Sequence, residues 1–286
     1  MDAGLFGPGS VTWTIHGDPS MAVAGFRALL LQAVHPLVMA GFDASSGFRD
    51  DPWGRLRRTG EWIATVTYGT TEQAEAAGRS LRRMHSRLSA GVEPETGRTF
   101  RPDDPDLLLW VHCTEVESFL STYRRCGGRL SDVEADRYVD EMRASACLVG
   151  LDPERVPRSV SGIEDYYEQV RPGLRVTALA RRTSLWSFVP PMPRWVALAT
   201  PARPAWASMM LLAAAMLPRW ARQLYGFPGL SVVDGSASLA GRVVRRSLVS
   251  VPGDLTRSPA HRAALRRVAT TSPSSPLTWP TVENHG

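Results

Sequence analysis

Apolar positions recur three and four residues apart through most of the chain, which is the pattern of amphipathic α-helices. Prolines at helix starts and glycines at helix ends divide this pattern into many short and medium-length helices. The sequence therefore predicts an all-α fold in which residues 1–270 form a single multi-helix domain. Residues 271–286 have a polar, proline-containing composition and are predicted to be a disordered tail.

Two consecutive helices in the first third of the chain have clear start and stop signals. The first begins with Asp51 as a cap and Pro52 at the first helical position, and Gly69 ends it. The second begins at Thr70, with Gln73 at the spacing of a capping box. We expect these two helices to form an antiparallel pair joined by a tight turn.

The two helices carry polar side chains within partly apolar faces. Arg55 and Thr59 share a face of the first helix with three apolar residues, and Arg58 lies at its edge. His85 lies in an apolar stripe of the second helix, which also contains Leu81, Met84 and Leu88. An imidazole that faces hydrogen-bond donors across an apolar slot suits a haem. Ordinary core packing of a lone histidine explains the same pattern, so both interpretations stay open.

Other segments yield more limited predictions. Residues 1–19 are expected to be an arm with short turns, with His16 as a surface or capping residue. The apolar pattern predicts a helix from residue 21 to about 40, kinked at Pro36, where His35 packs in the core or contacts a haem edge. A helix from Asp104 to about residue 125 has His112 on its buried face, which makes His112 the rival iron ligand or a second contact to the cofactor.

The second half of the chain contains an apolar run at residues 205–217. It is shorter than the roughly 20 residues that a membrane-spanning helix needs. The sequence predicts a buried helix, and the alternative is a membrane-facing surface with two tryptophans and two arginines at its border: Trp206, Trp220, Arg219 and Arg222. Residues 226–235 read as a turn region and residues 237–248 as a helix, while His261 and His285 are expected to be solvated.

The net charge of +5 comes from arginine, because the sequence contains no lysine. The arginines are scattered and often lie near acidic residues, which argues against a nucleic-acid-binding surface. The net charge does allow a weak attraction to anionic lipid headgroups.

Three cysteines, Cys113, Cys126 and Cys147, do not suggest a disulfide framework and fit a reducing compartment. The sequence lacks a C-x-x-C-H motif, so any haem would be held without covalent attachment. No basic segment followed by an apolar run opens the sequence, so we expect no signal peptide and a cytoplasmic location.

Three strings resemble the rubber-oxygenase/MpaB-type family, and two further strings are similar to its bacterial members. The first three are RLRRT at residues 55–59, RRMH at 82–85 and WVHCT at 110–114. The other two are LLLQAVHP at 29–36 and DPDLLLWVH at 104–112. Their order and spacing are more specific than any one string, and the resemblance extends over about residues 9–167.

The resemblance implies a haem b in a globin-like helical core. By its R-x-x-H string, Arg82 and His85 match the proximal side, and His85 would be the iron ligand. By its R-x-x-K-T string, Arg55, Arg58 and Thr59 match the distal side. Thr114 would match a later threonine of the family, with His112 beside it as a further contact to the cofactor.

This sequence departs from the family pattern at Arg58, where the family has a lysine that can reach the iron. Arginine stays protonated and is a poor ligand, so the sixth iron position is not assigned. We expect Arg55 and Thr59 to donate hydrogen bonds to bound dioxygen, and Arg58 and Arg82 to pair with the haem propionates.

These observations predict a haem b-dependent oxidoreductase, an oxygenase that uses dioxygen on a small or apolar organic substrate. Two alternatives stay open. One is a haem-binding protein without turnover, such as a sensor or carrier. The other is a helical protein without haem, in which His85 is a packed core residue.

Overall fold

The computed structural model describes residues 2–45, 50–227, 229–250 and 257–269. Fourteen α-helices lie in these ranges, together with two 3-10 turns and one pair of two-residue strands. In chain order the elements are α1 (Val11–His16), α2 (Met21–Gln32), α3 (Pro36–Ala44), α5 (Pro52–Tyr68), α6 (Thr71–Arg87), β1 (Gly91–Val92), β2 (Thr99–Phe100), α7 (Pro105–Arg125), α8 (Asp132–Val149), η1 (Pro153–Arg155), α9 (Val160–Val170), η2 (Arg171–Gly173), α10 (Ala178–Phe188), α11 (Arg194–Ala199), α12 (Ala202–Ala215), α13 (Arg219–Tyr225), α14 (Ser231–Val249) and α16 (Pro259–Ala269).

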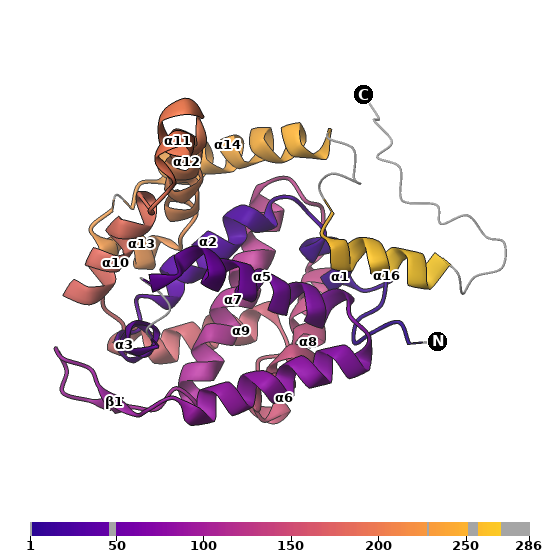
Figure 1. Ribbon diagram of the computed structural model, residues 1–286, viewed down its shortest axis with the longest axis horizontal. Helices are drawn as coiled ribbons and strands as arrows, with labels where there is room; N and C mark the ends of the chain where they lie inside the picture. Colours follow the sequence, from indigo (N-terminus) through magenta and orange to yellow (C-terminus); the bar gives the residue numbers. More distant parts are fainter. Residues whose placement is uncertain (1, 46–49, 228, 251–256, 270–286) are drawn as a thin grey trace.

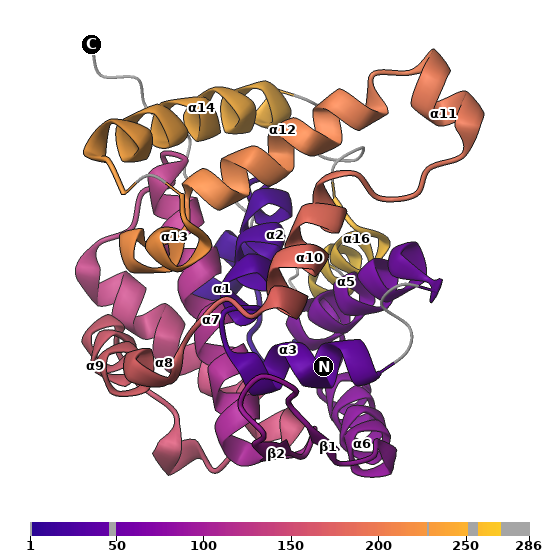
Figure 2. The same ribbon diagram turned by 90° about the vertical axis from the view of Figure 1, so that its left-hand side faces the viewer.

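The fold is all-α, as predicted. The strands β1 and β2 pair in antiparallel register, with Gly91 opposite Phe100, and form a small hairpin between α6 and α7. Helices α11, α12 and α14 lie on one side of the molecule, and α6 and the β1–β2 hairpin lie on the opposite side (Figures 1 and 2). The predicted tail at residues 271–286 lies outside the described residues.

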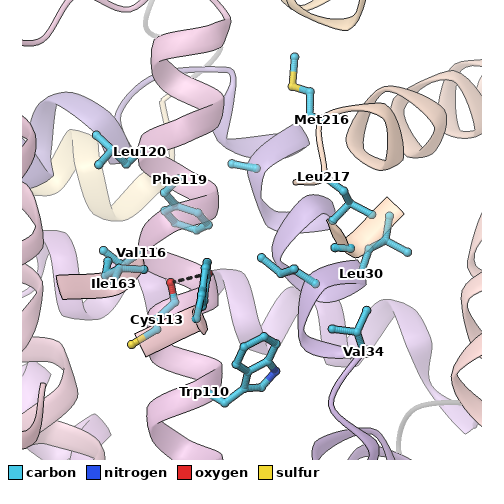
Figure 3. Close-up of a cluster of buried hydrophobic side chains, with 14 of the residues drawn as sticks. Leu30, Val34, Trp110, Cys113, Val116, Phe119, Leu120, Ile163, Met216 and Leu217 are labelled. Atoms are coloured by element: carbon cyan, nitrogen blue, oxygen red, sulfur yellow. Dashed lines mark hydrogen bonds between the residues drawn. The ribbon is translucent and has the colours of Figure 1, made fainter. Parts of the chain in front are cut away.

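Helices α2 and α7 form the centre of the hydrophobic core. The close-up in Figure 3 shows Leu30 of α2, and Val34 in the turn after it, on the side of α7 toward which Trp110 points. Trp110 is completely buried, and its indole Nε1 donates a hydrogen bond to the carbonyl of Gln32 at 3.2 Å. The two helices are therefore joined by apolar packing and by a satisfied buried polar contact.

A buried arginine connects three parts of this core. The guanidinium of Arg27 on α2 donates to both carboxylate oxygens of Glu117 on α7, at 2.6 and 2.8 Å. It also donates to the hydroxyl of Ser118 at 2.6 Å and, through Nε, to the carbonyl of Met216 after α12 at 2.8 Å. One buried side chain thus ties α2 to α7 and to the end of α12 with charge-assisted hydrogen bonds.

The N-terminal arm expected at residues 1–19 is instead partly helical, and the surface position predicted for His16 is wrong. Helix α1 buries Trp13 and Ile15. The His16 ring lies with Nδ1 2.8 Å from the Thr67 hydroxyl and Nε2 3.1 Å from the Tyr138 hydroxyl. A six-residue helix is too short to show a helical period in the sequence, which explains the error.

The apolar helix predicted at residues 21–40 is broken rather than kinked. Helices α2 and α3 meet at a bend of 107°. His35 caps α3, because its Nδ1 accepts a hydrogen bond from the Val38 amide at 3.4 Å. Burial lowers the pKa of His35 to about 4, so the ring is neutral and can accept this hydrogen bond.

Three further predictions are changed by the structure. The apolar run at 205–217 forms α12, which buries Met210 but leaves Leu211 exposed, so only one face is in the core. Helix α14 begins at Ser231, within the segment predicted as a turn. His261 is buried and stacks on Tyr68 with 4.2 Å between ring centroids, so its predicted solvation is wrong, and His285 lies outside the described residues.

No single helix in the described ranges is long and apolar enough to cross a bilayer. The pair α2 and α3 passes this test only jointly, across its 107° bend, and most of α2 is buried in the core.

We predict that Arg27→Ala destabilises the fold strongly, because it leaves the Glu117 carboxylate and the Ser118 hydroxyl without this donor, while the Met216 carbonyl keeps a hydrogen bond from Arg125. The free energy of unfolding should fall by about 3–5 kcal/mol, as for other broken buried ion pairs. Urea denaturation at neutral pH measures this loss. Arg57→Ala removes an exposed pair with Glu61 and should cost less than about 1 kcal/mol. Equal losses in the two variants would contradict the prediction.

Candidate functional site

Helices α5 and α6 form the predicted hairpin, and its start and stop signals are confirmed. Asp51 accepts a hydrogen bond from the Gly54 amide at 2.8 Å, and Thr70 and Gln73 form the complete capping box. The two helices are joined at the short turn around Gly69 and diverge away from it (Figures 1 and 2). The hairpin therefore has a closed end at the turn and an open end at residues 55–59 and 82–85.

The closed end is packed tightly. Val66 of α5 and Ala74 of α6 are buried against Leu148 at the end of α8. Gly78 is required here, because a Cβ atom would lie 2.8 Å from the Leu148 carbonyl oxygen. This close approach of α6 to α8 fixes the direction of α6 as it leaves the turn.

Both ends of the described chain reach the turn of the hairpin. The Asp2 carboxylate accepts hydrogen bonds from the amide and hydroxyl of Thr71, at 2.6 and 2.9 Å. The Arg267 guanidinium on α16 donates to the carbonyl of Tyr68 at 2.9 Å. Asp2 thus caps the start of α6, and Arg267 binds the end of α5.

His85 lies in the last turn of α6 at the open end, and its side chain is half-buried. Its Nδ1 atom is buried and has no hydrogen-bond partner among the described residues. Burial lowers the pKa of His85, and the nearby Asp103 carboxylate opposes this shift in part. A buried polar atom without a partner is unfavourable, and His85 is one of several such side chains in the described ranges, among them Trp13 and Tyr68.

Arg82, one turn before His85, is anchored to α8. Its guanidinium donates a hydrogen bond to the Leu148 carbonyl. This carbonyl lies beside Gly150, the C-cap of α8, which has φ +99°. Arg82 therefore helps to hold the last turns of α6 in place, and the rest of its guanidinium remains available for other acceptors.

Arg55 is the distal candidate with the most defined surroundings. Its side chain is half-buried, and its Nη1 donates to the Ser45 hydroxyl at 2.9 Å and the Phe42 carbonyl at 3.4 Å. Its guanidinium also lies 5.0 Å from the centre of the Phe42 ring. Burial and the neighbouring Arg58 lower the pKa of Arg55, although arginine stays charged at neutral pH.

Arg58 and Thr59 lie at the same end of α5 but are exposed. Arg58 pairs with the Asp51 carboxylate at 3.1 Å. The Thr59 hydroxyl donates to the Arg55 carbonyl one turn earlier, at 3.0 Å. The structure therefore brings the three α5 candidates to one helix end, but the observed hydrogen bonds of Arg58 and Thr59 stay within that end.

His112 and Thr114 differ in their surroundings on α7. Thr114 is completely buried, and its hydroxyl lies 2.8 Å from the Trp110 carbonyl and 2.9 Å from the Val111 carbonyl, so its helix satisfies it. His112 is half-buried and has no hydrogen-bond partner within the described ranges. Burial lowers the pKa of His112 to about 4, so its ring is also neutral.

The sequence reasoning did not single out Glu115. It lies three residues after His112, which places both on one side of α7. Burial raises the pKa of Glu115 to about 7, and its charge acts on the buried Tyr138 of α8. The available signal in the sequence was an acidic residue beside the apolar stripe of α7, one helical turn after His112.

The structure also contains an apolar pocket that the sequence did not predict. The pocket has a volume of about 100 Å³. It lies between α2, α3, α5, α10 and α12, and its lining includes Leu30, Phe42, Leu56, Trp186, Trp206 and Met210. Phe42 and Leu56 connect it to Arg55, since Phe42 contacts the guanidinium and Leu56 is the next residue.

No cluster of three or more His, Cys, Asp or Glu side chains suited to a metal ion occurs in the described part of the chain. A haem iron needs only one protein side chain as its ligand. The unpartnered His85 is thus the feature to test against such a group.

Comparison with known proteins gives one match. Residues 13–248 match the family model described as "ER-bound oxygenase mpaB/B'/Rubber oxygenase, catalytic domain". No curated protein and no solved structure matches the chain. The matched range runs from α1 to α14 and includes the hairpin, α7 and the pocket. On this match, which spans most of the sequence, the chain belongs to the mpaB/rubber oxygenase catalytic domain family.

Proposed function

We propose that this protein is a haem b-dependent oxygenase that uses dioxygen to oxidise a small, apolar organic substrate. Membership of an oxygenase family supports the reaction class. The observation that carries the haem proposal is His85, a neutral imidazole whose buried Nδ1 has no partner in the described residues. His85 fits the group because iron binds neutral imidazole.

The residues around His85 would hold the haem by complementary charge. His85 would bind the iron, and His112, which is half-buried on α7, would be a further contact to the cofactor. Arg82 and Arg58 would pair with the propionates, since a guanidinium grips carboxylates in a forked geometry. Each has donors beyond the single hydrogen bond that it makes to Leu148 or Asp51. When bound, haem supplies the redox-active iron that activates dioxygen.

Arg55 is the residue best placed to act on the oxygen side. Ser45 and Phe42 fix its guanidinium, so its charge is already oriented before any ligand binds. A fixed cation stabilises negative charge that develops nearby at little reorganisation cost. Thr59 can add a second donor only if its hydroxyl leaves the Arg55 carbonyl. Arg58 would not replace the family lysine as a ligand, because it stays protonated.

The apolar pocket supports an apolar substrate. Most of its lining side chains are aliphatic, aromatic or thioether groups, with Thr183, Ser184 and Ser187 as the polar exceptions, so a ligand that is mainly apolar loses the least hydration there. A dry apolar cavity of roughly 150 Å³ can bind benzene in another protein. The observed volume of about 100 Å³ suits a ligand of similar size or one apolar segment of a longer molecule.

Glu115 would be partly protonated at neutral pH. Burial raises its pKa to about 7, so its carboxyl group is partly protonated under physiological conditions. A group with this pKa can release or accept a proton in an oxidation reaction. The charge of Glu115 contributes to the raised pKa of Tyr138. The Tyr138 hydroxyl is hydrogen-bonded to His16, and His16 is hydrogen-bonded to Thr67.

The first prediction concerns haem binding. The purified protein supplemented with haem should show a Soret band, and His85→Ala should lose it, because the iron loses its ligand. Absorption spectroscopy of the oxidised and reduced forms measures this. His112→Ala, a change of the same size on α7, should keep the iron ligand and the band.

The same spectra distinguish the alternatives. Absence of a Soret band in the wild type, or full haem retention in His85→Ala, would overturn the proposal. A haem-loaded protein that consumes no oxygen with any alkene, terpenoid or phenol would instead be a carrier or sensor.

The second prediction concerns the pocket. Leu56→Trp should fill the space, because Leu56 lines it and tryptophan adds volume. We expect benzene to raise the melting temperature of the wild type but not of Leu56→Trp, while the haem spectrum is kept. Leu107→Met is the control, because it changes a buried leucine outside the pocket to a side chain of nearly the same volume. Equal stabilisation of wild type and Leu56→Trp would place benzene elsewhere.

The third prediction concerns pH. The folded-state pKa of Glu115, about 7, lies above its ordinary value of 4.5. Between these values the folded chain keeps a proton that the unfolded chain has released, so this group's contribution to stability falls as pH rises through the window. The glutamine in Glu115→Gln does not titrate, so it does not cause this fall in stability as pH rises. The unfolding free energy of Glu115→Gln should therefore rise relative to wild type between about pH 5 and pH 7. A constant difference across this range in urea titrations would contradict the raised pKa.

A further inference from the structure

Charge is unevenly distributed along the chain. Residues 171–250 contain eleven arginines and a single acidic residue, Asp234. The whole chain carries a net charge of +5, so this segment has a charge of +10 and the remainder a charge of −5. The segment forms helices α10 to α14. Three of them, α11, α12 and α14, lie together on one side of the molecule (Figures 1 and 2).

The same segment holds most of the exposed apolar side chains. Thirteen of the eighteen large hydrophobic residues that are exposed in the described part of the chain lie between Leu185 and Val249. Nine of them lie on α11, α12 and α14: Trp195, Leu198, Leu211, Val232, Leu239, Val243, Val244, Leu248 and Val249. We call the side formed by these three helices the cationic apolar face. Exposed apolar residues gathered in this way mark an interaction site.

Helix α14 shows that this exposure is not a by-product of packing. Its buried positions are small residues, Ala237 and Gly241, and a Cβ atom on Gly241 would lie 2.5 Å from the Met216 methyl group. Its large residues point outward, with Leu239 63% and Val243 57% exposed. A helix that only stabilised the core would bury its large apolar residues and expose its small ones.

Helix α11 adds an aromatic residue to this face. Trp195 is 69% exposed and Leu198 81% exposed on this six-residue helix, which projects beyond α12 (Figure 2). Tryptophan is enriched where proteins meet the boundary between lipid headgroups and acyl chains.

The arginines of this face are not neutralised within the protein. Asp234, the one acid of the segment, is occupied by Arg219 and Arg222, at 2.8 and 2.7 Å. Four exposed arginines on α11, α12 and α14 have no carboxylate partner within the described residues: Arg194, Arg203, Arg242 and Arg246. Their positive charge is available to an anionic partner.

We propose that the cationic apolar face docks on an anionic lipid surface. Arginines beside exposed tryptophan, leucine and valine match a bilayer surface, where headgroups carry negative charge and acyl chains lie just beneath. No membrane-spanning helix is needed for this attachment. Helices α10 and α12 also line the apolar pocket, so docking brings the pocket close to molecules dissolved in the bilayer. The proposal is independent of haem.

Vesicle co-sedimentation of the full-length protein tests the proposal. The protein should partition onto phosphatidylcholine vesicles that contain phosphatidylglycerol and far less onto pure phosphatidylcholine, and added salt should weaken binding. Leu239→Glu/Val243→Glu should lower the partition coefficient by about tenfold or more, because it places charge on the apolar stripe. Arg242→Gln/Arg246→Gln should lower it by a similar factor and reduce the salt dependence.

Two controls separate docking from general effects. Val133→Glu changes another exposed valine, on α8, and should bind like the wild type. Arg137→Gln/Arg158→Gln removes the same amount of charge from arginines that are paired with Glu141 and Glu154, and should have little effect. Circular dichroism checks that each variant is folded.

Three outcomes would overturn the proposal. The first is no preference of the wild type for anionic vesicles at low salt. The second is equal binding of the α14 variants and the α8 control. The third is a dimer in sedimentation velocity that Leu239→Glu/Val243→Glu dissociates, which would assign the face to a second copy of the chain.

Discussion

The buried guanidinium of Arg27 is the interaction on which the arrangement of the helices depends. It satisfies Glu117 and Ser118 on α7 and the Met216 carbonyl where α12 ends. A buried arginine is stable only if its donors find acceptors, so α2, α7 and the end of α12 must meet at one point. This constraint fixes the central pair of helices and positions α12 over α2, which in turn defines one wall of the apolar pocket.

The candidate site uses a different principle, the contrast between the two ends of one hairpin. Close packing at Gly78 and Ala74 commits α6 to α8 near the turn. At the other end the polar side chains of α5 and α6 are fixed by their own local partners, and His85 has an unsatisfied buried nitrogen. Rigid support on one side and an incompletely satisfied polar group on the other are typical of a binding site.

The sequence predicted what local signals encode. Capping residues and prolines located α5, α6 and α7 almost to the residue, because a cap is a contact within one turn. His16 and His261 were misplaced, since their partners Thr67 and Tyr68 are distant in sequence. The apolar pocket was missed because five helices build it. The resemblance that named the family rested on strings in the matched range, and the roles of their side chains remain predictions.

The contacts of Asp2 and Arg267 at the vertex of the hairpin have a consequence for variation within the family. Both residues lie outside the matched range of 13–248, yet they hold the two peptide segments from which α5 and α6 diverge. Extensions beyond a shared catalytic domain can therefore set the spread between α5 and α6. A relative with different terminal segments would hold these two helices at a wider or narrower angle while every motif in the domain stays the same.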